Sequence, residues 1–307
     1  MPERRRLLLA INPNASFGRA SDAGPRAIEL LRAAGHDVRP LVAPDYAVLA
    51  ERTAEALADG PDALVVIGGD GMVHLGAGLV GGTGTPLGLI PVGTGNDFAR
   101  GLGIARHDVP AAVAGLLAAL EHAPTAIDTG VAGWTDERGT RVERRFVGAV
   151  SCGFDAFVNE RANRMRRPKG PIRYQLALAR ELVGLRPIDY RIEWDGGVLE
   201  QTGILVSVAN NRSIGGGITI TPDASMTDGL LDLFVVEALS RSAFLRIYPR
   251  VASGTHLDDP RVTVLRTRQA RIAAEGVVAY ADGERLAPLP IDVRIEPGSL
   301  RFLGRVS

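Results

Sequence analysis

The first part of the chain alternates short apolar runs with amphipathic stretches, a pattern typical of strands joined by crossover helices on a parallel sheet. The apolar runs predict strands at residues 7–12, 37–42, 63–67 and 87–91. The amphipathic stretches predict helices at residues 25–34, 45–57 and 108–121, the last two beginning at the N-cap residues Asp45 and Asp108. These residues therefore predict a doubly wound α/β domain.

After Asp128 the pattern changes to period-two apolar runs separated by Gly, Asp and Pro. Strands without regular crossover helices are expected to pair antiparallel and to pack as a β-sandwich or a barrel, and the sandwich is favoured. Strands are predicted at residues 146–151, 188–194, 204–210, 230–236, 262–265 and 291–295, and helices at 172–185 and 242–251. The expected division is a doubly wound domain at residues 1–127 and a β-sandwich domain at 128–307, with the last strand or tail free to return to the first domain.

The amino-acid composition excludes several classes of protein and of binding site. Of the 307 residues, 46% are apolar and 23% are charged, as in globular proteins. The 35 basic and 35 acidic residues balance, so nucleic acid is not expected as a partner. Cys152 is the only cysteine, which excludes an internal disulfide and a cysteine-rich zinc site. The sequence lacks a signal-peptide pattern and a run of roughly 20 apolar residues, so a cytoplasmic protein without a transmembrane segment is expected.

A glycine-rich loop follows the third predicted strand. Residues 68–71 read Gly-Gly-Asp-Gly, and glycines at the end of a strand let backbone N–H groups come close to an anion. A tight turn without a ligand explains one such loop equally well.

A second glycine-rich loop follows the next strand, where residues 93–100 read Gly-Thr-Gly-Asn-Asp-Phe-Ala-Arg. The carboxyl ends of parallel strands are where α/β folds bind nucleotides, so the two loops are expected to meet at one edge of the sheet. Thr94, Asn96 and Asp97 add a hydroxyl, an amide and a carboxylate that suit a triphosphate and its Mg²⁺. Asn96 and Asp97 also fit a helix cap, and both roles are compatible.

These motifs resemble the prokaryotic diacylglycerol kinase, sphingosine kinase-like and YegS-type lipid kinase family. The resemblance runs in order over nearly the whole chain. It includes the two loops above, Ser-Cys-Gly-Phe-Asp-Ala at 151–156, Asn210, three glycines at 215–217, Asp-Gly-Leu-Leu-Asp at 228–232, Gly-Thr-His at 254–256 and Asp-Gly-Glu at 282–284.

The resemblance implies an ATP- and Mg²⁺-dependent lipid kinase with its active site in the cleft between the two domains. The ATP site would comprise three loops, made by Asn12, Pro13, Asn14, Ala15 and Ser16; by Gly68, Gly69, Asp70, Gly71, Met72, Val73 and His74; and by Thr94, Gly95, Asn96 and Asp97.

The resemblance also implies that Glu284 accepts the proton of the lipid hydroxyl, with Asp282 beside it and Asp70 nearby. A carboxylate fits this task, because phosphoryl transfer needs a base only to orient the hydroxyl and take its proton. The residues alone predict a hairpin turn at Asp282-Gly283, and a turn can present Glu284 to a substrate.

A structural Mg²⁺ site is implied as well. Asp228 would supply a carboxylate, and Ser225 and Leu230 would supply backbone carbonyl oxygens. Without the resemblance, Asp228-Gly229 indicates only a turn.

The sequence departs from the family pattern after Gly71. Met72 stands where a hydroxyl-bearing residue is usual, and His74 where an amide is usual. Because the cradle rests mainly on backbone N–H groups, ATP binding is expected to survive. A packed structural histidine is the favoured interpretation of His74.

Several functions remain open at this point. Diacylglycerol is the favoured acceptor. Sphingosine, ceramide, monoacylglycerol and phosphatidylglycerol remain alternatives, because the apolar side chains that line lipid grooves do not specify the lipid. An NAD kinase and a catalytically silent lipid-binding module share the fold. A lipid substrate would be reached at the inner face of the membrane, where the basic stretch at 161–173 is either a contact or a solvated surface, and the resemblance is compatible with a homodimer.

Overall fold

The computed structural model describes residues 3–13, 22–165, 167 and 171–304 of the chain. By its internal contacts the chain divides into two compact units. The first comprises Met1–Ile127 and Gly298–Ser307, and the second comprises Asp128–Pro297. Two strands, β5 (Thr125–Thr135) and β17 (Ile291–Phe302), cross the boundary between the units.

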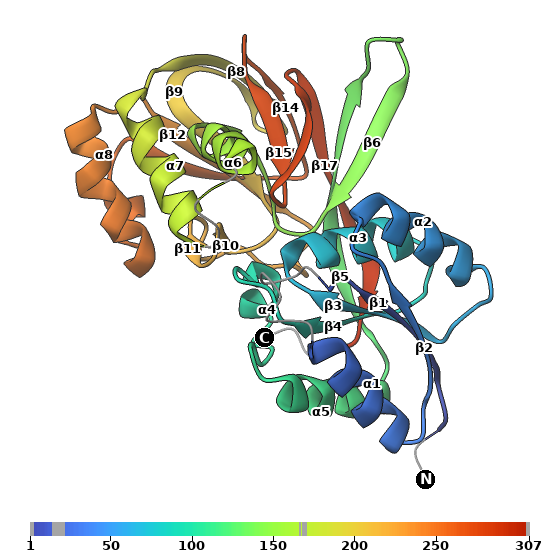
Figure 1. Cartoon of the computed structure of the whole chain (residues 1–307). Helices are drawn as coiled ribbons and strands as arrows, with labels where there is room; N and C mark the ends of the chain where they lie inside the picture. The colour runs from blue at the N-terminus through green and yellow to red at the C-terminus, as the bar shows by residue number, and fades with distance from the viewer. Residues whose placement is uncertain (1–2, 14–21, 166, 168–170, 305–307) are drawn as a thin grey trace. The chain divides into compact units, whose positions relative to one another are not determined.

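The first unit is built on a parallel sheet in the order β2-β1-β3-β4 (Figure 1). Its strands are β1 (Arg6–Ile11), β2 (Asp37–Val42), β3 (Ala63–Gly68) and β4 (Leu87–Pro91). The end of β17 joins β4 in parallel, with Phe302 opposite Leu87. The alternating pattern of the sequence therefore produced the expected doubly wound sheet.

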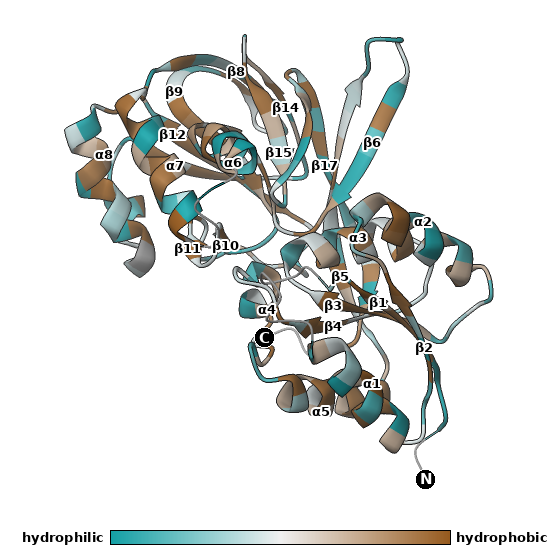
Figure 2. Cartoon of the chain, in the orientation of Figure 1, coloured by the Kyte–Doolittle hydropathy of each residue, from teal (hydrophilic) through white to brown (hydrophobic). Residues whose placement is uncertain are grey.

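Helices cover both faces of this sheet, which explains why β3 is buried along its whole length. One face packs against α1 (Ala23–Ala33) and α5 (Val109–Leu120), and the other against α2 (Tyr46–Leu57) and α3 (Asp70–Val80). Figure 2 shows the strands between these layers in the colours of apolar residues. The expected caps are confirmed, since Asp45 accepts the Val48 N–H at 3.0 Å and Asp108 accepts the Ala111 N–H at 2.9 Å.

The second unit is a sandwich of antiparallel strands, as the period-two pattern predicts. β9 (Gly197–Ala209) belongs to both layers, because its first half pairs with β8 (Ile188–Trp194) and its second half with β7 (Ala149–Gly153) and β12 (Leu231–Glu237). The remaining strands of the sandwich are β6 (Arg141–Phe146), β13 (Val262–Thr267), β14 (Gln269–Ala273), β15 (Val278–Ala281) and β16 (Glu284–Pro288), together with parts of β5 and β17.

Glycine allows the bend in β9. A Cβ atom on Gly203 would lie 2.7 Å from the carbonyl oxygen of Val236, so no larger residue fits at this crossing. The register of β12 against β9 shifts at the same point, between Val236 and Glu237.

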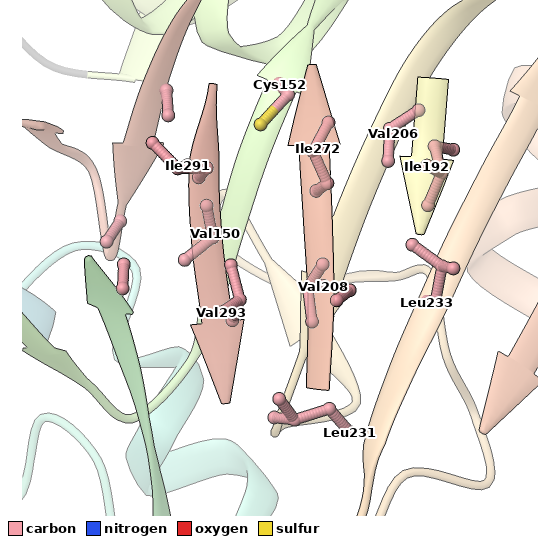
Figure 3. Packing of buried hydrophobic residues seen from close by; sticks show 14 of the residues in the cluster. Val150, Cys152, Ile192, Val206, Val208, Leu231, Leu233, Ile272, Ile291 and Val293 are labelled. Atoms are coloured by element: carbon pink, nitrogen blue, oxygen red, sulfur yellow. The ribbon is translucent and has the colours of Figure 1, made fainter. Parts of the chain in front are cut away.

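An apolar core fills the space between the two layers (Figure 3). Branched residues from both layers contribute, among them Val150, Val206, Leu233, Ile272 and Ile291. Cys152 points into the same core and is fully buried.

A second apolar core lies on the outer face of the layer that contains β7, β9 and β12. Three helices cover this face, namely α6 (Phe154–Arg164), α7 (Pro171–Val183) and α8 (Arg241–Ile247). Two short 3₁₀ helices follow α8, Tyr248–Ser253 and Thr255–Asp258, and a small hairpin pairs β10 (Ser213–Ile214) with β11 (Ile218–Thr219).

One predicted strand is wrong. Residues 146–151 are not a single strand, because β6 ends at Phe146 and β7 begins at Ala149. The backbone N–H groups of Val147 and Gly148 donate to the carboxylate of Asp282 instead of to a neighbouring strand. The sequence analysis also missed α6, β5 and the strands that lie between residues 269 and 288.

Candidate functional site

The predicted nucleotide loops of the first unit lie at one edge of its sheet. The strand register places Ile11 opposite Ile67 and Gly68 opposite Pro91, so β1, β3 and β4 end side by side. Asn12 and Pro13 follow β1 there, and both are half-buried. Asn14, Ala15 and Ser16 lie outside the described residues.

The two glycine-rich loops are in direct backbone contact. A Cβ atom built on Gly93 would lie 2.3 Å from the Cα of Gly69, and one built on Gly69 would lie 3.0 Å from the Cα of Gly93. The N–H of Val92 donates to the carbonyl of Gly68 at 2.9 Å, which fixes the loops together. Only glycine permits this approach of the two loops.

Polar side chains stabilise the loops, one within the second loop and one between the two segments. Asn96 adopts a left-handed conformation, with a φ of 53°, and its amide donates to the carbonyl of Gly93 at 2.7 Å. Asp70, in the first turn of α3, accepts the N–H of Phe98 at 3.1 Å. Asp97 lies beside them and is buried, whereas Thr94 is exposed at the loop surface.

Asn96 lies at the N-cap position of the next helix, as the sequence predicts, but its side chain does not cap that helix. The Asn96 side chain makes no capping hydrogen bond to the short helix α4 (Asp97–Gly101), because its amide is turned back to Gly93, and Asp70 accepts the N–H of Phe98 in the first turn of this helix instead. Asn96 instead stabilises the glycine loop itself.

The unusual residues after Gly71 belong to α3. Met72 is buried and folds over Gly68, where an added Cβ would lie 2.3 Å from its Cγ. Val73 is also buried, and His74 is half-buried on the same helix. Met72 therefore packs against the strand end, and the N–H groups that shape the turn, such as those of Met72 and Val73 donating to Gly69, remain in place.

In the second unit, Asp282 and Gly283 form the two-residue turn between β15 and β16. Their φ values are 51° and 87°, and Ala281 pairs with Glu284 across the turn. This is the hairpin turn that the Asp-Gly pair predicts. Glu284 is the first residue of β16, and its side chain is exposed.

The carboxylate of Asp282 is engaged by backbone. It accepts the N–H groups of Val147, Gly148 and Ala149 at 3.0, 2.8 and 3.2 Å. From the other side, the buried Asn210 donates its amide to the carbonyl of Val147 at 3.1 Å. Asp282 thus holds the hairpin of Glu284 against the start of β7.

The predicted metal residues lie in a tight turn before β12. One carboxylate oxygen of Asp228 accepts the N–H of Leu230 at 3.0 Å, and the other pairs with the guanidinium of Arg266. Asp232 lies nearby, and its pKa is raised to about 6 by burial and by the negative charges of Asp228 and Asp223, with Arg266 acting in the opposite direction. The described residues contain no group of three acidic, histidine or cysteine side chains placed to hold a metal.

An apolar cavity of about 80 Å³ opens between the helical layer and the outer sheet face of the second unit. Its walls come from α6, α7, α8 and the strands β9 and β12, with Leu178, Phe234 and Phe244 among them. Asp155 and His256 also line it and are both buried, and Tyr174 and Tyr248 contribute side chains that carry hydroxyl groups.

Asp155 was not singled out by the sequence analysis. It lies in the first turn of α6, and burial raises its pKa to about 6 although the Ser151 hydroxyl and the Ala156 N–H favour the ionised form. A carboxylate within an otherwise apolar helical layer could have indicated Asp155. That layer is recognised only in the structure, because its burial depends on contacts from distant parts of the chain.

Comparison with known proteins gives the family. Residues 6–132 match the diacylglycerol kinase catalytic domain, and residues 148–304 match the YegS C-terminal domain, described as NAD kinase beta sandwich-like. A diacylglycerol kinase of Mycobacterium tuberculosis (strain H37Rv) is 37% identical over 304 residues, covering 95% of this chain and 93% of that protein. The chain belongs to the diacylglycerol kinase family. It is a lipid kinase of the diacylglycerol kinase type.

Other relatives agree with this assignment. A diacylglycerol kinase of Bacillus subtilis is 30% identical over 233 residues, covering 75% of this chain and 73% of that protein. The crystal structure of a diacylglycerol kinase from Bacillus anthracis covers all of both chains with a TM-score of 0.71 at 21% identity, which shows the same fold.

The fold alone does not separate lipid kinases from nicotinamide nucleotide kinases. Yeast NADH kinase matches with a TM-score of 0.56 at 14% identity, covering 97% of this chain and 82% of that chain. The family assignment therefore rests on sequence. Within the described residues, no helix combines the length and apolarity needed to cross a membrane.

The buried carboxyl of Asp155 predicts a pH-dependent stability. Its pKa is raised from the usual 3.8 to about 6, so this group stabilises the folded state below pH 4, and that contribution is lost as the pH rises through 6. Asp155→Asn cannot ionise, so it should not lose stability as the pH rises, and its free energy of unfolding at pH 7 should exceed that of wild type by up to about 3 kcal/mol. Urea unfolding of both proteins between pH 4 and 8 measures the difference, and equal curves would contradict the burial of a charged group.

Proposed function

We propose that the protein transfers the γ-phosphoryl group of ATP to the hydroxyl of a lipid, with diacylglycerol as the favoured acceptor and phosphatidic acid as the product. The observation that carries the proposal is the backbone contact of Gly69 with Gly93 at the carboxyl ends of the strands. A nucleotide-binding edge of this kind, in a chain of the diacylglycerol kinase family, supports ATP as the donor.

The nucleotide site comprises the residues predicted from the sequence. Backbone N–H groups of the loops at 68–71 and 93–96 would hold the phosphates, and the exposed Thr94 hydroxyl would add a hydrogen bond. Asn96 and Asp70 position the loops through their contacts with Gly93 and Phe98. Two loops packed backbone against backbone suit a ligand that is bound by backbone N–H groups.

Two features of the second unit support a lipid as the acceptor. Its apolar cavity fits hydrocarbon, and α7 and α8 expose apolar residues on their outer faces, with Ile172, Val183 and Leu245 between 60 and 68% exposed. Arg180, Arg186, Arg241 and Arg246 are exposed on or near the same helices. Apolar side chains among arginines suit the surface of an anionic membrane, so the helical layer is the proposed membrane contact at the inner face.

Glu284 is the proposed base. Its exposed carboxylate at the start of β16 can accept a proton from a bound hydroxyl, and the hairpin turn limits its movement. Asp282 acts on the same reaction as a positioning residue, since its oxygens accept three backbone N–H groups. Asp70 likewise stabilises the nucleotide loops through Phe98.

A divalent ion is proposed near Asp228, where the carboxylates of Asp228, Asp223 and the buried Asp232 lie close together and Arg266 pairs with Asp228 and Asp232. Mg²⁺ needs few protein ligands because it keeps several waters. Asp228 with the carbonyls of Ser225 and Leu230 would hold it, and the ion would reduce the repulsion that raises the pKa of Asp232. Its proposed role here is to stabilise the turn before β12.

The nucleotide site is tested at Gly69. In Gly69→Val a side chain would meet the backbone of Gly93 and cover the proposed phosphate cradle, so ATP affinity should fall at least 100-fold. Calorimetric titration with ATP measures the effect, with Gly115→Ala as the control because a Cβ there meets nothing within 4 Å. An unchanged ATP affinity in a folded Gly69→Val protein would remove these loops from the site.

The base is tested at Glu284. Glu284→Gln keeps the shape but loses basicity, so single-turnover phosphate transfer to dispersed diacylglycerol should slow by about 10²–10⁴-fold with little change in lipid binding. Asp282→Asn places an amide against backbone N–H groups, so it should lower thermal stability as well as activity. A Glu284→Gln rate within a few-fold of wild type would refute the assignment, and phosphate transfer to NAD in place of lipid would favour the nicotinamide nucleotide alternative.

The Mg²⁺ site is tested at Asp228. In Asp228→Ala activity should fall at low Mg²⁺ and be partly restored by excess Mg²⁺, because the loss of one carboxylate weakens binding of the ion without removing the reacting groups. Activity is measured against Mg²⁺ concentration. Identical dependence in wild type and variant would exclude an ion at this turn.

A further inference from the structure

One guanidinium contacts two carboxylates at the turn before β12. The Arg266 guanidinium pairs with one carboxylate oxygen of Asp228, and its Nε lies 4.0 Å from a carboxylate oxygen of Asp232. The strand register explains the second contact, because Asp232 on β12 lies directly opposite Arg266 on β13. The other oxygen of Asp228 accepts the N–H of Leu230 at 3.0 Å, so both oxygens of this carboxylate are engaged.

The carboxylate of Asp232 has too few partners for its burial. Its side chain is only 5% exposed, and among the described residues the carboxylate makes no hydrogen bond and pairs only with Arg266, at 4.0 Å. A buried carboxylate is costly unless a cation or a hydrogen-bond donor lies close to it. The turn therefore favours a cation that can approach Asp228 and Asp232 together.

Other charged groups at the turn do not remove this need. Asp128 accepts a backbone N–H of the turn at 2.7 Å, and Asp223 is close enough to act electrostatically on Asp232, so both add negative charge. The guanidinium of Arg212 donates to the carbonyl oxygen of Ala224 at 3.1 Å and pairs with no carboxylate among the described residues. Arg266 is therefore the side chain that stands where a divalent ion would act.

Arg266 is able to leave the turn, because its side chain is 50% exposed. An ion pair with so exposed a partner contributes little to stability, so breaking it costs little. A guanidinium and a divalent cation on the same carboxylate oxygen repel each other. We propose that Arg266 is an internal competitor of the divalent ion: its guanidinium holds the turn when the ion is not bound, and it turns to solvent when the ion binds Asp228. This inference rests on the Mg²⁺ site of the proposed function.

The competition makes the turn responsive to the concentration of Mg²⁺. With Arg266 in place, the turn keeps its folded form at low Mg²⁺, and the ion is bound more weakly than by the carboxylates alone. Without the guanidinium, the same carboxylates bind the ion more tightly, and the turn depends on the ion for its stability. A residue that merely positioned Asp228 for the ion would have the opposite effect, because its removal would weaken ion binding.

The competition is measured by thermal unfolding without nucleotide, from EDTA to saturating Mg²⁺. NaCl keeps the ionic strength constant, because salt alone screens exposed ion pairs. The shift of the unfolding midpoint with Mg²⁺ concentration gives the apparent dissociation constant of the ion. Arg266→Met removes the charge and keeps the length of the side chain, so it should bind Mg²⁺ at least about threefold more tightly than wild type. In EDTA it should unfold at a lower temperature than wild type, and Mg²⁺ should narrow this difference.

Two controls separate the competition from a general loss of charge. Arg271→Met removes a guanidinium of similar exposure, 48% against 50%, which pairs with Asp292 at 2.6 Å on other strands. Its unfolding temperature should differ from that of wild type by the same amount at every Mg²⁺ concentration. Arg266→Lys keeps the charge, so its affinity for Mg²⁺ should stay within about twofold of wild type. Arg266→Gln, which keeps hydrogen-bond donors without the charge, repeats the test if the methionine variant does not fold.

The outcomes are separable. An affinity for Mg²⁺ in Arg266→Met that is weaker than in wild type, or stronger by less than about threefold, would overturn the competition. Absence of any Mg²⁺ effect in both proteins would overturn it together with the ion site at Asp228. Phosphate transfer to diacylglycerol by wild type is measured in parallel and decides the kinase function separately, because the turn supplies no reacting group.

Discussion

The carboxylate of Asp282 organises the second unit around the proposed reaction. By accepting the N–H groups of Val147, Gly148 and Ala149, it ends one strand, begins the next and holds its own hairpin against both. The side-chain amide of Asn210 holds the same segment, because it donates to the carbonyl oxygen of Val147 and also to that of Asp128. The place of Glu284, the start of β7 and hence the position of Asp155 all follow from this one set of hydrogen bonds.

The fold class could be predicted from the sequence because it depends on local periodicity. The alternation of apolar runs and amphipathic helices, with caps at Asp45 and Asp108, specified the parallel sheet, and period-two runs specified the sandwich. The meeting of the two glycine loops also followed, since consecutive parallel strands end at one edge. The Asp-Gly turn before Glu284 is a local signal of the same kind.

What the sequence did not reveal depends on partners far apart in the chain. Asp282 and its backbone donors are 133–135 residues apart, and no local pattern connects them. Asp228 pairs with Arg266, 38 residues away, which a turn motif alone does not indicate. The roles assigned to Glu284, Thr94 and the metal residues stay predictions, because a fold shared with an NADH kinase fixes positions and not chemistry.

The return of the chain end to the first unit has a consequence for synthesis. The N–H of Leu303 donates to the carbonyl of Leu87 at 2.8 Å, Thr125 donates to the carbonyl of Gly304 at 2.7 Å, and the buried ring of Phe302 packs edge-on against Phe98 at 5.3 Å. The first unit is therefore incomplete while the ribosome is still translating the sandwich. β17 also pairs with β14 in the sandwich, so both units gain this strand together. The edge of the first sheet stays open until β17 has emerged from the ribosome, and a nascent chain stalled or cut before that point leaves β4 unprotected.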